Sequence, residues 1–233
     1  MEDLDLQTIF VRAGDEFGYR RVDARFVENS DLKIKWIRSG NMVNFLITDY
    51  LRDAPADVLE TLAETVFRRM YENADCPYDD SFIEYLTTDN FVMEQQPVYL
   101  SRLGCASASP VGRSKDLRKS LQRLKDNGLI KPVPLTYMGW MPMSGSDGIA
   151  VSSALMRSVC INERLDRSDV PDDLIDFCLY TQLLKIGQGF SKNHKENNQE
   201  YIRMIEEYPD SERFIGELGS RGLSLWKTLS PAC

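Results

Sequence analysis

Alternating polar and hydrophobic residues predict a β-hairpin in the first quarter of the chain. Residues Lys33 to Arg38 read K-I-K-W-I-R, which has the period of two that is typical of a half-buried strand, and a second apolar run follows from Val43 to Thr48. Ser39, Gly40 and Asn41, which separate the two runs, are turn-forming residues. The pattern therefore predicts two strands joined by a tight turn.

Hydrophobic residues at helical spacing predict a helix from Ala56 to about Tyr71, with Pro55 suited to its first turn. Short helical pieces are expected from Tyr78 to Ser101, and the segment from Gly104 to Gly112, rich in Ser, Ala and Pro, predicts a loop. This loop separates an N-terminal strand–helix half from a C-terminal half that contains the long helix. We expect the two halves together to form one compact unit. The two halves cover residues 1–103 and 113–233.

The second half begins with a predicted amphipathic helix from about Lys115 to Asp126, whose leucines form one stripe. Its other elements are expected to be three strands, one long helix and two shorter helices. Their predicted ranges are Leu135–Met141, Gly148–Ser153, Met156–Asn162, Pro171–Ile186, Lys195–Glu207 and Ser211–Gly219. The pattern indicates an α+β fold with a mixed sheet and packed helices.

The two halves share a short sequence pattern. F-L-I-T-D-Y-L-R-D-A-P-A-D-V-L, from Phe45, resembles V-C-I-N-E-R-L-D-R-S-D-V-P-D-D-L-I, from Val159, when a two-residue insertion is allowed. Both copies predict a strand, a short acidic loop, a proline and a long helix. One repeat of two leaves an internal duplication and a coincidence both open.

Composition narrows the function classes. The 233 residues have a net charge of -8, which opposes the phosphate binding that drives most contacts with nucleic acid. No apolar run approaches the roughly 18 to 20 residues of a membrane span, and the first residues lack a signal peptide pattern. We therefore expect a cytoplasmic protein that binds neither membranes nor nucleic acid.

Cysteine and histidine are too few for the common metal sites. The five cysteines are scattered without a C-x-x-C pair, and we expect Cys160 and Cys178 to be buried, inert thiols. His194 is the single histidine of the chain, which excludes sites that need two imidazoles from this chain.

Four segments carry a resemblance to a known family. They are I-K-W-I-R-S with I-T-D-Y-L-R-D-A-P-A-D-V-L-E-T-L-A, D-L-R-K-S-L-Q-R-L-K-D-N-G-L-I, V-P-D-D-L-I-D-F-C-L-Y-T-Q-L-L-K-I-G-Q-G-F, and E-Y-I-R-M-I-E-E-Y-P. From about Leu32 to Leu218 the chain resembles an SprT-like, gluzincin-type family of predicted archaeal zinc metallopeptidases. The resemblance implies a zincin-like fold, with an H-E-x-x-H motif on the long helix and a third histidine after it.

The catalytic positions that the resemblance implies are replaced in this chain. The first ligand becomes Thr181, the general base becomes Gln182 and the second ligand becomes Lys185, while His194 is the one possible remaining ligand. A neutral hydroxyl binds zinc poorly, an amide cannot accept a proton as a carboxylate does, and an ammonium repels a divalent cation. We therefore expect neither a zinc site nor another cofactor, unless Cys178, Glu196 or Glu200 joins His194.

The sequence favours a catalytically inactive, metallopeptidase-like protein that acts as a binding or scaffold module for a protein partner. Its predicted contact surface is the basic side of one helix, formed by Arg118, Lys119, Arg123 and Lys125. The acidic cluster from Asp166 to Asp176 is interpreted as solvated helix capping.

Two alternatives stay open. One is an enzyme: a metal-dependent peptidase rebuilt around His194, or the DNA-associated proteolysis that the resemblance suggests. The other is a subunit of a larger complex, for which Trp140, Met141 and Met143 would form an exposed apolar patch.

Overall fold

The computed structural model describes residues 3–71, 76–143, 145–190 and 194–226. The chain divides into two compact units, Met1–Phe91 and Val92–Ser230. Both units are α+β, and the described residues form eight α-helices and two three-stranded mixed sheets. The predicted α+β class is confirmed at this level. The loop predicted at 104–112 lies within the second unit.

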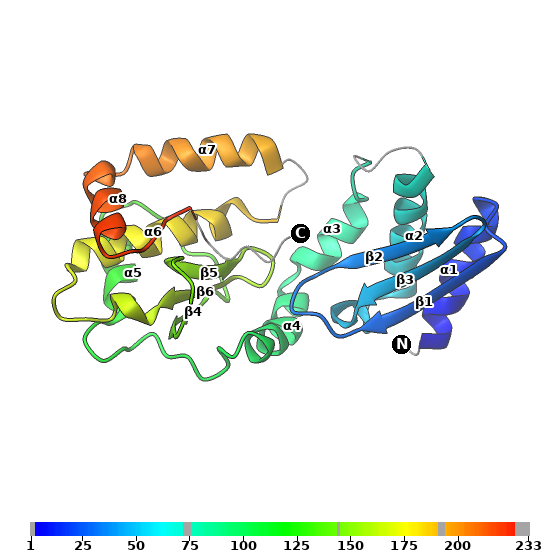
Figure 1. The fold of residues 1–233 in the computed structure, drawn as a ribbon, viewed down its shortest axis with the longest axis horizontal. Coiled ribbons are helices and arrows are strands. Elements are labelled where there is room, and N and C mark those ends of the chain that lie inside the picture. The colour runs from blue at the N-terminus through cyan, green and yellow to red at the C-terminus, as the bar shows by residue number, and fades with distance from the viewer. Residues whose placement is uncertain (1–2, 72–75, 144, 191–193, 227–233) are drawn as a thin grey trace. The chain divides into compact units, whose positions relative to one another are not determined.

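The first unit places two helices on one face of a sheet (Figure 1). Its strands run in the order β1-β3-β2, with β1 parallel and β2 antiparallel to β3. The elements, in chain order, are α1 (Asp3–Glu16), β1 (Arg21–Val27), β2 (Ile34–Ser39), β3 (Met42–Thr48), the 3-10 helix η1 (Asp49–Leu51), α2 (Ala56–Tyr71) and α3 (Asp80–Thr87).

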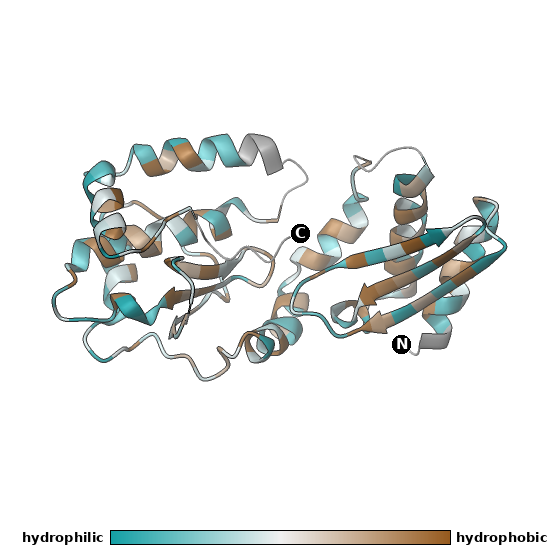
Figure 2. Cartoon of the chain, viewed as in Figure 1, coloured by the Kyte–Doolittle hydropathy of each residue, from teal (hydrophilic) through white to brown (hydrophobic). Residues whose placement is uncertain are grey.

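Alternate residues of β1 and β3 point into the core of this unit. Val43, Phe45 and Ile47 of β3 are buried, whereas Met42 and Asn44, which alternate with them, are exposed and Leu46 is half-buried. Figure 2 shows the resulting hydrophobic stretches along β3. The core is closed by rings such as Phe67 of α2, which contacts Phe45 edge-on at 5.1 Å between ring centroids.

The predicted hairpin is β2 and β3, and the predicted helix is α2 with the expected bounds. The closing pair of the hairpin is Ser39 with Met42, and the turn between them contains Gly40 with φ of 56°. That dihedral matches the tight turns that join antiparallel strands. The elements predicted from the sequence begin at Lys33, so α1 and β1 are additional to them.

The second unit repeats this plan after the connecting helix α4 (Asp89–Arg102). Its elements are α5 (Leu117–Asp126), β4 (Tyr137–Met141), β5 (Ala150–Ser153), β6 (Ser158–Asn162), the 3-10 helix η2 (Glu163–Leu165), α6 (Asp172–Gln188), α7 (His194–Glu206) and α8 (Ser211–Ser220). The strand order is β4-β6-β5, with β4 parallel and β5 antiparallel to β6. All six predicted elements after the first helix are present, with ends that shift by up to two residues.

The shared plan bears directly on the internal repeat. In each unit a helix precedes three strands, the third strand is central, and a three-residue 3-10 helix follows it. Leu51 and Leu165, which the repeat pairs, both end these 3-10 helices and are fully buried. Pro55 and Pro171 both stand directly before the long helix. The matched topology supports an internal duplication over a coincidence.

Candidate functional site

The candidate site lies on α6, the central helix of the second unit. Eleven of its seventeen residues are buried, because β5, β6, α5, α7 and α8 all contact it. A helix enclosed in this way has little solvent face, so polar residues on it need internal partners. Thr181 and Gln182, at two of the three positions where the resemblance implies catalytic residues, are both completely buried.

Thr181 and Gln182 belong to one hydrogen-bonded network. Ser152 Oγ of β5 donates to Gln182 Oε1 at 2.8 Å, and Gln182 Nε2 donates to Thr181 Oγ1 at 3.1 Å. Thr181 Oγ1 in turn donates to the carbonyl oxygen of Cys178 at 2.8 Å. Both side chains therefore serve packing between α6 and β5, and neither is presented to a cleft.

Lys185 faces α7, one helical turn after Thr181. Its Nζ lies 5.2 Å from the centroid of the Tyr201 ring, a cation–π distance. Burial lowers the pKa of Lys185 to about 8. Burial also raises the pKa of Tyr201, against the opposing effect of a hydrogen bond with Thr181. Lys185 therefore does not simply extend into water from the end of α6.

These residues do not fit a zinc ion. A hydroxyl and an amide that already bond to each other, and an ammonium group, offer no anionic or imidazole donor. His194 begins α7, and its side chain lies outside the described residues. Cys178 is fully buried, whereas Glu200 is exposed. Among the described residues, no three His, Cys, Asp or Glu side chains gather closely enough to hold a metal.

The predicted basic contact surface is partly occupied by ion pairs within the chain. Arg118 pairs with Asp116 at the start of α5, which lowers the pKa of that carboxyl. Arg123 pairs with Asp176 of α6 and contributes to packing between the two helices. Of the four predicted residues, two are therefore already paired with acidic residues of this chain.

Solvated capping, the interpretation given above to the acidic cluster, is wrong for two of its members. Asp176 is 8% exposed and paired with Arg123. The carboxylate of Asp166 accepts the backbone N–H groups of residues 113, 114 and 115, at 2.5 to 2.9 Å. Successive N–H groups of this kind form an anion-binding nest, which here is filled by the chain's own side chain.

The apolar patch predicted from Trp140, Met141 and Met143 is also absent. All three side chains are buried, with exposed fractions of 8, 8 and 6%. Trp140 Nε1 donates to the carbonyl of Pro110 at 3.2 Å, so the segment before α5 covers this tryptophan. Hydrophobicity alone did not distinguish a core strand from an exposed surface.

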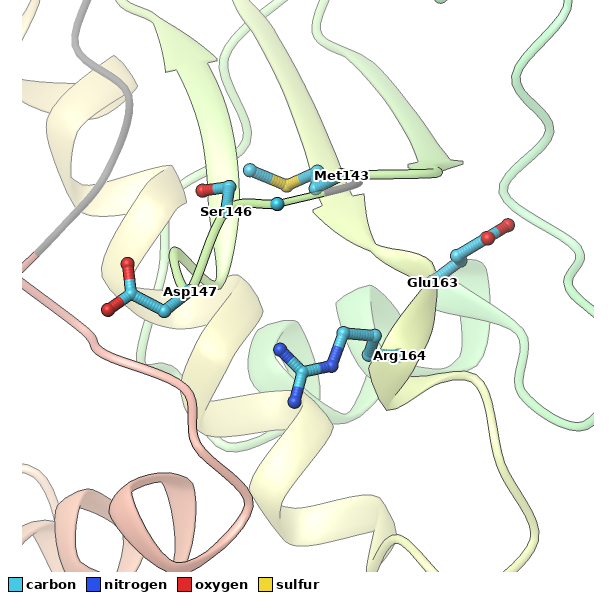
Figure 3. A pocket seen from close by; sticks show the side chains of 6 residues that line it. Met143, Ser146, Asp147, Glu163 and Arg164 are labelled. Carbon is cyan, nitrogen blue, oxygen red and sulfur yellow. The ribbon is translucent and has the colours of Figure 1, made fainter.

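A shallow pocket of about 340 Å³ lies between the 143–147 loop and η2, lined by Met143, Ser146, Asp147, Glu163 and Arg164 among others. Figure 3 shows Arg164 extending below the loop while Glu163 points away from it. The Arg164 guanidinium donates to the carbonyls of Arg221 and Gly222, at 2.9 and 3.5 Å. Arg164 therefore braces the C-terminal segment against η2.

Ser152 and Tyr201 complete the α6 network and are not among the site residues predicted from the sequence. Both come from elements distant in the chain, although a serine on a half-buried strand next to a buried glutamine is a usable signal. Among the helices that the structure describes, none has the length and apolar character that crossing a membrane requires. Comparisons with known protein families, curated proteins and solved structures found no significant match for this chain.

Proposed function

We propose that this chain is a catalytically inactive, metallopeptidase-like protein that acts as a cytoplasmic binding or scaffold module. The observation that carries the proposal is the buried network of Ser152, Thr181 and Gln182. Because these side chains satisfy one another in the interior, converting them into ligands would require breaking a packed contact between α6 and β5. The SprT-like resemblance remains part of this proposal.

The competing function is a metal-dependent peptidase built around His194. Zinc content distinguishes the two. The protein is expressed without a tag, purified and analysed for metal by mass spectrometry, with His194→Ala as the matched variant. The proposal expects no stoichiometric zinc and no cleavage of an unfolded casein substrate. Stoichiometric zinc that is lost in His194→Ala, together with casein cleavage, would overturn it.

The binding role has its own test. The protein is captured at its native level from its own cells, and proteins retained in stoichiometric amount are identified. A reproducible protein partner is expected. A protein that elutes alone, with unchanged mass in light scattering, contradicts a scaffold role. The alternative of a subunit in a larger complex relied on an exposed apolar patch. That patch is absent, because Trp140, Met141 and Met143 are buried.

A further inference from the structure

β1 and β2, the two edge strands of the first sheet, differ in how their outer backbone groups are hydrogen-bonded. On the β1 side, the Gln7 amide of α1 takes the place of a neighbouring strand: its Nε2 donates to Val22 O, and its Oε1 accepts from Ala24 N, both at 2.7 Å. On the β2 side, in the part of the chain that the structure describes, no hydrogen bond reaches the outer backbone groups. One edge is therefore partly bonded within the chain, and the other is open.

The register identifies the open groups. Thr48 N–H donates to Lys33 O, so residue 33 faces β3, and alternation along an antiparallel strand turns every second residue the same way. The N–H and C=O groups of Ile34, Trp36 and Arg38 consequently point away from the sheet. This edge offers three donors and three acceptors along one line.

The side chains on β2 are mostly exposed, and they are apolar, polar or basic but never acidic. Trp36 and Ile37 are 39 and 64% exposed, unusual values for large apolar residues on a strand. Lys35 lies on the face of the sheet away from the core, opposite Leu46. Arg38 lies on the other face, over the Tyr19 ring at 5.6 Å from its centroid. Figure 2 shows hydrophobic and hydrophilic stretches succeeding one another along β2. No acidic residue occurs from Ile34 to Met42.

The charge of this edge indicates what it can bind. In a chain with a net charge of -8, the strands of the first sheet carry four cations and one acid: Arg21, Arg25, Lys35, Arg38 and Asp23. A second copy of β2 would bring its own Lys35 and Arg38 into the same ribbon, and such cations on edge strands oppose self-pairing. An acidic segment meets no such repulsion.

We propose that β2 is a docking strand for an extended acidic peptide segment of another protein. The segment adds to the sheet by backbone hydrogen bonds with Ile34, Trp36 and Arg38. Its acidic side chains lie beside Lys35, on the face of the sheet away from the core. An apolar side chain covers Trp36 on the other face, where Arg38 adds a longer-range attraction to the acidic segment. The inference names a partner class for the proposed binding role, but it concerns the first unit and does not depend on whether the second unit is catalytic.

The test uses the full chain and a fluorescein-labelled decapeptide of alternating glutamate and valine. Fluorescence anisotropy measures the affinity for wild type and for Lys35→Glu/Arg38→Glu. The matched control is Arg21→Glu/Arg25→Glu, which makes the same charge change on the opposite edge strand of the sheet. We expect the β2 variant to bind at least about tenfold more weakly, and the control to change affinity by less than about threefold. Circular dichroism establishes that both variants are folded.

Backbone pairing is tested separately from charge attraction. A peptide of alternating glutamate and proline has the same charge but lacks the alternate N–H groups, and it is expected to bind at least about tenfold more weakly. Amide exchange at Ile34, Trp36 and Arg38, followed by NMR, is expected to slow when the glutamate–valine peptide is added. Equal binding of the two peptides, slowed exchange elsewhere, or pairing of β2 with a second copy in place of the peptide would overturn the proposal. Stoichiometric zinc in the second unit would leave this result unchanged.

Discussion

The guanidinium of Arg123 on α5 binds the carboxylate of Asp176 on α6 at two points, Nε to Oδ2 at 2.6 Å and Nη2 to Oδ1 at 2.7 Å. This paired geometry is the strong form of an arginine–carboxylate contact, and it raises the pKa of Arg123. The carboxylate is almost buried, whereas the arginine side chain is 39% exposed. The contact therefore joins two helices and leaves only part of Arg123 at the surface.

Replacing Arg123 by Met is expected to lower the free energy of unfolding by about 2 kcal/mol, because Asp176 keeps its charge in a nearly buried place without its cation. The loss stays below that of a fully buried pair, since water reaches Arg123. Urea denaturation measures it. Arg118→Met removes a more exposed arginine of the same helix and is expected to cost clearly less, because water screens that ion pair. Equal losses of unfolding free energy in both variants would show that the contact with Asp176 stabilises the fold no more than the exposed pair of Arg118 does.

Gln182→Glu introduces a carboxyl group at a completely buried position. Burial raises the folded-state pKa of such a group above its unfolded value of about 4.3, so the variant is not penalised near pH 4 and loses stability as pH rises. We expect it to be at least about 1 kcal/mol less stable at pH 8 than at pH 5, relative to wild type. Thermal or urea unfolding at the two pH values provides the comparison.

Gln182→Met is the control for the loss of the Gln182 hydrogen bonds with Ser152 and Thr181 without an added charge. It is expected to cost about 1–3 kcal/mol at both pH values, because it leaves Ser152 unsatisfied without adding a charge. A glutamate variant that behaves like the methionine variant at every pH would mean that the new carboxylate finds a cation in the interior.

Lys185 is expected to make stability depend on alkaline pH. Its folded-state pKa of about 8 lies below the unfolded value of about 10.4. Between these values the unfolded chain binds more protons, so the contribution of Lys185 to stability increases as pH rises from about 8 to about 10.4. The urea midpoint of wild type relative to Lys185→Met should therefore rise across this window. A flat difference would contradict burial of the amine, and Lys119→Met, which removes an exposed lysine, provides the reference profile.

Gly112 is expected to tolerate no side chain. A Cβ at this position would lie within about 2.5 Å of the Asp166 carboxylate, which binds the adjacent backbone N–H groups. Gly112→Ala should therefore cost about 1–3 kcal/mol through displacement of Asp166. Gly187→Ala is the control, because it has open space within a helix and should gain about 0.5–1 kcal/mol. Calorimetric unfolding of both variants decides the point.

The sequence predicted those elements whose signals are local. The β2–β3 hairpin follows from alternation and its turn, and α6 follows from a long apolar run after Pro171. β1 is not among the predicted strands, although its segment R-V-D-A-R-F-V has the same alternation of polar and apolar residues. Helical spacing correctly placed Thr181 and Lys185 on one side of α6.

Local sequence patterns do not predict which distant residues contact the site. Ser152 reaches Gln182 from thirty residues away, and Asp166 reaches the loop at 113–115 across more than fifty. Such contacts depend on how elements pack, which residue spacing does not encode. The same reason explains why Trp140 was expected at the surface: its cover is a loop that no periodicity marks.

The Gln7 amide limits how this protein can assemble. A sheet with two available edges can accept one neighbour after another, and that repetition is how fibrils elongate. Because the Val22 C=O and the Ala24 N–H are already bonded to Gln7, a strand added beside β1 would have to displace that amide, whereas a strand added beside β2 displaces no such bond. Assembly through this sheet therefore favours a single addition at β2 over repeated extension from both edges.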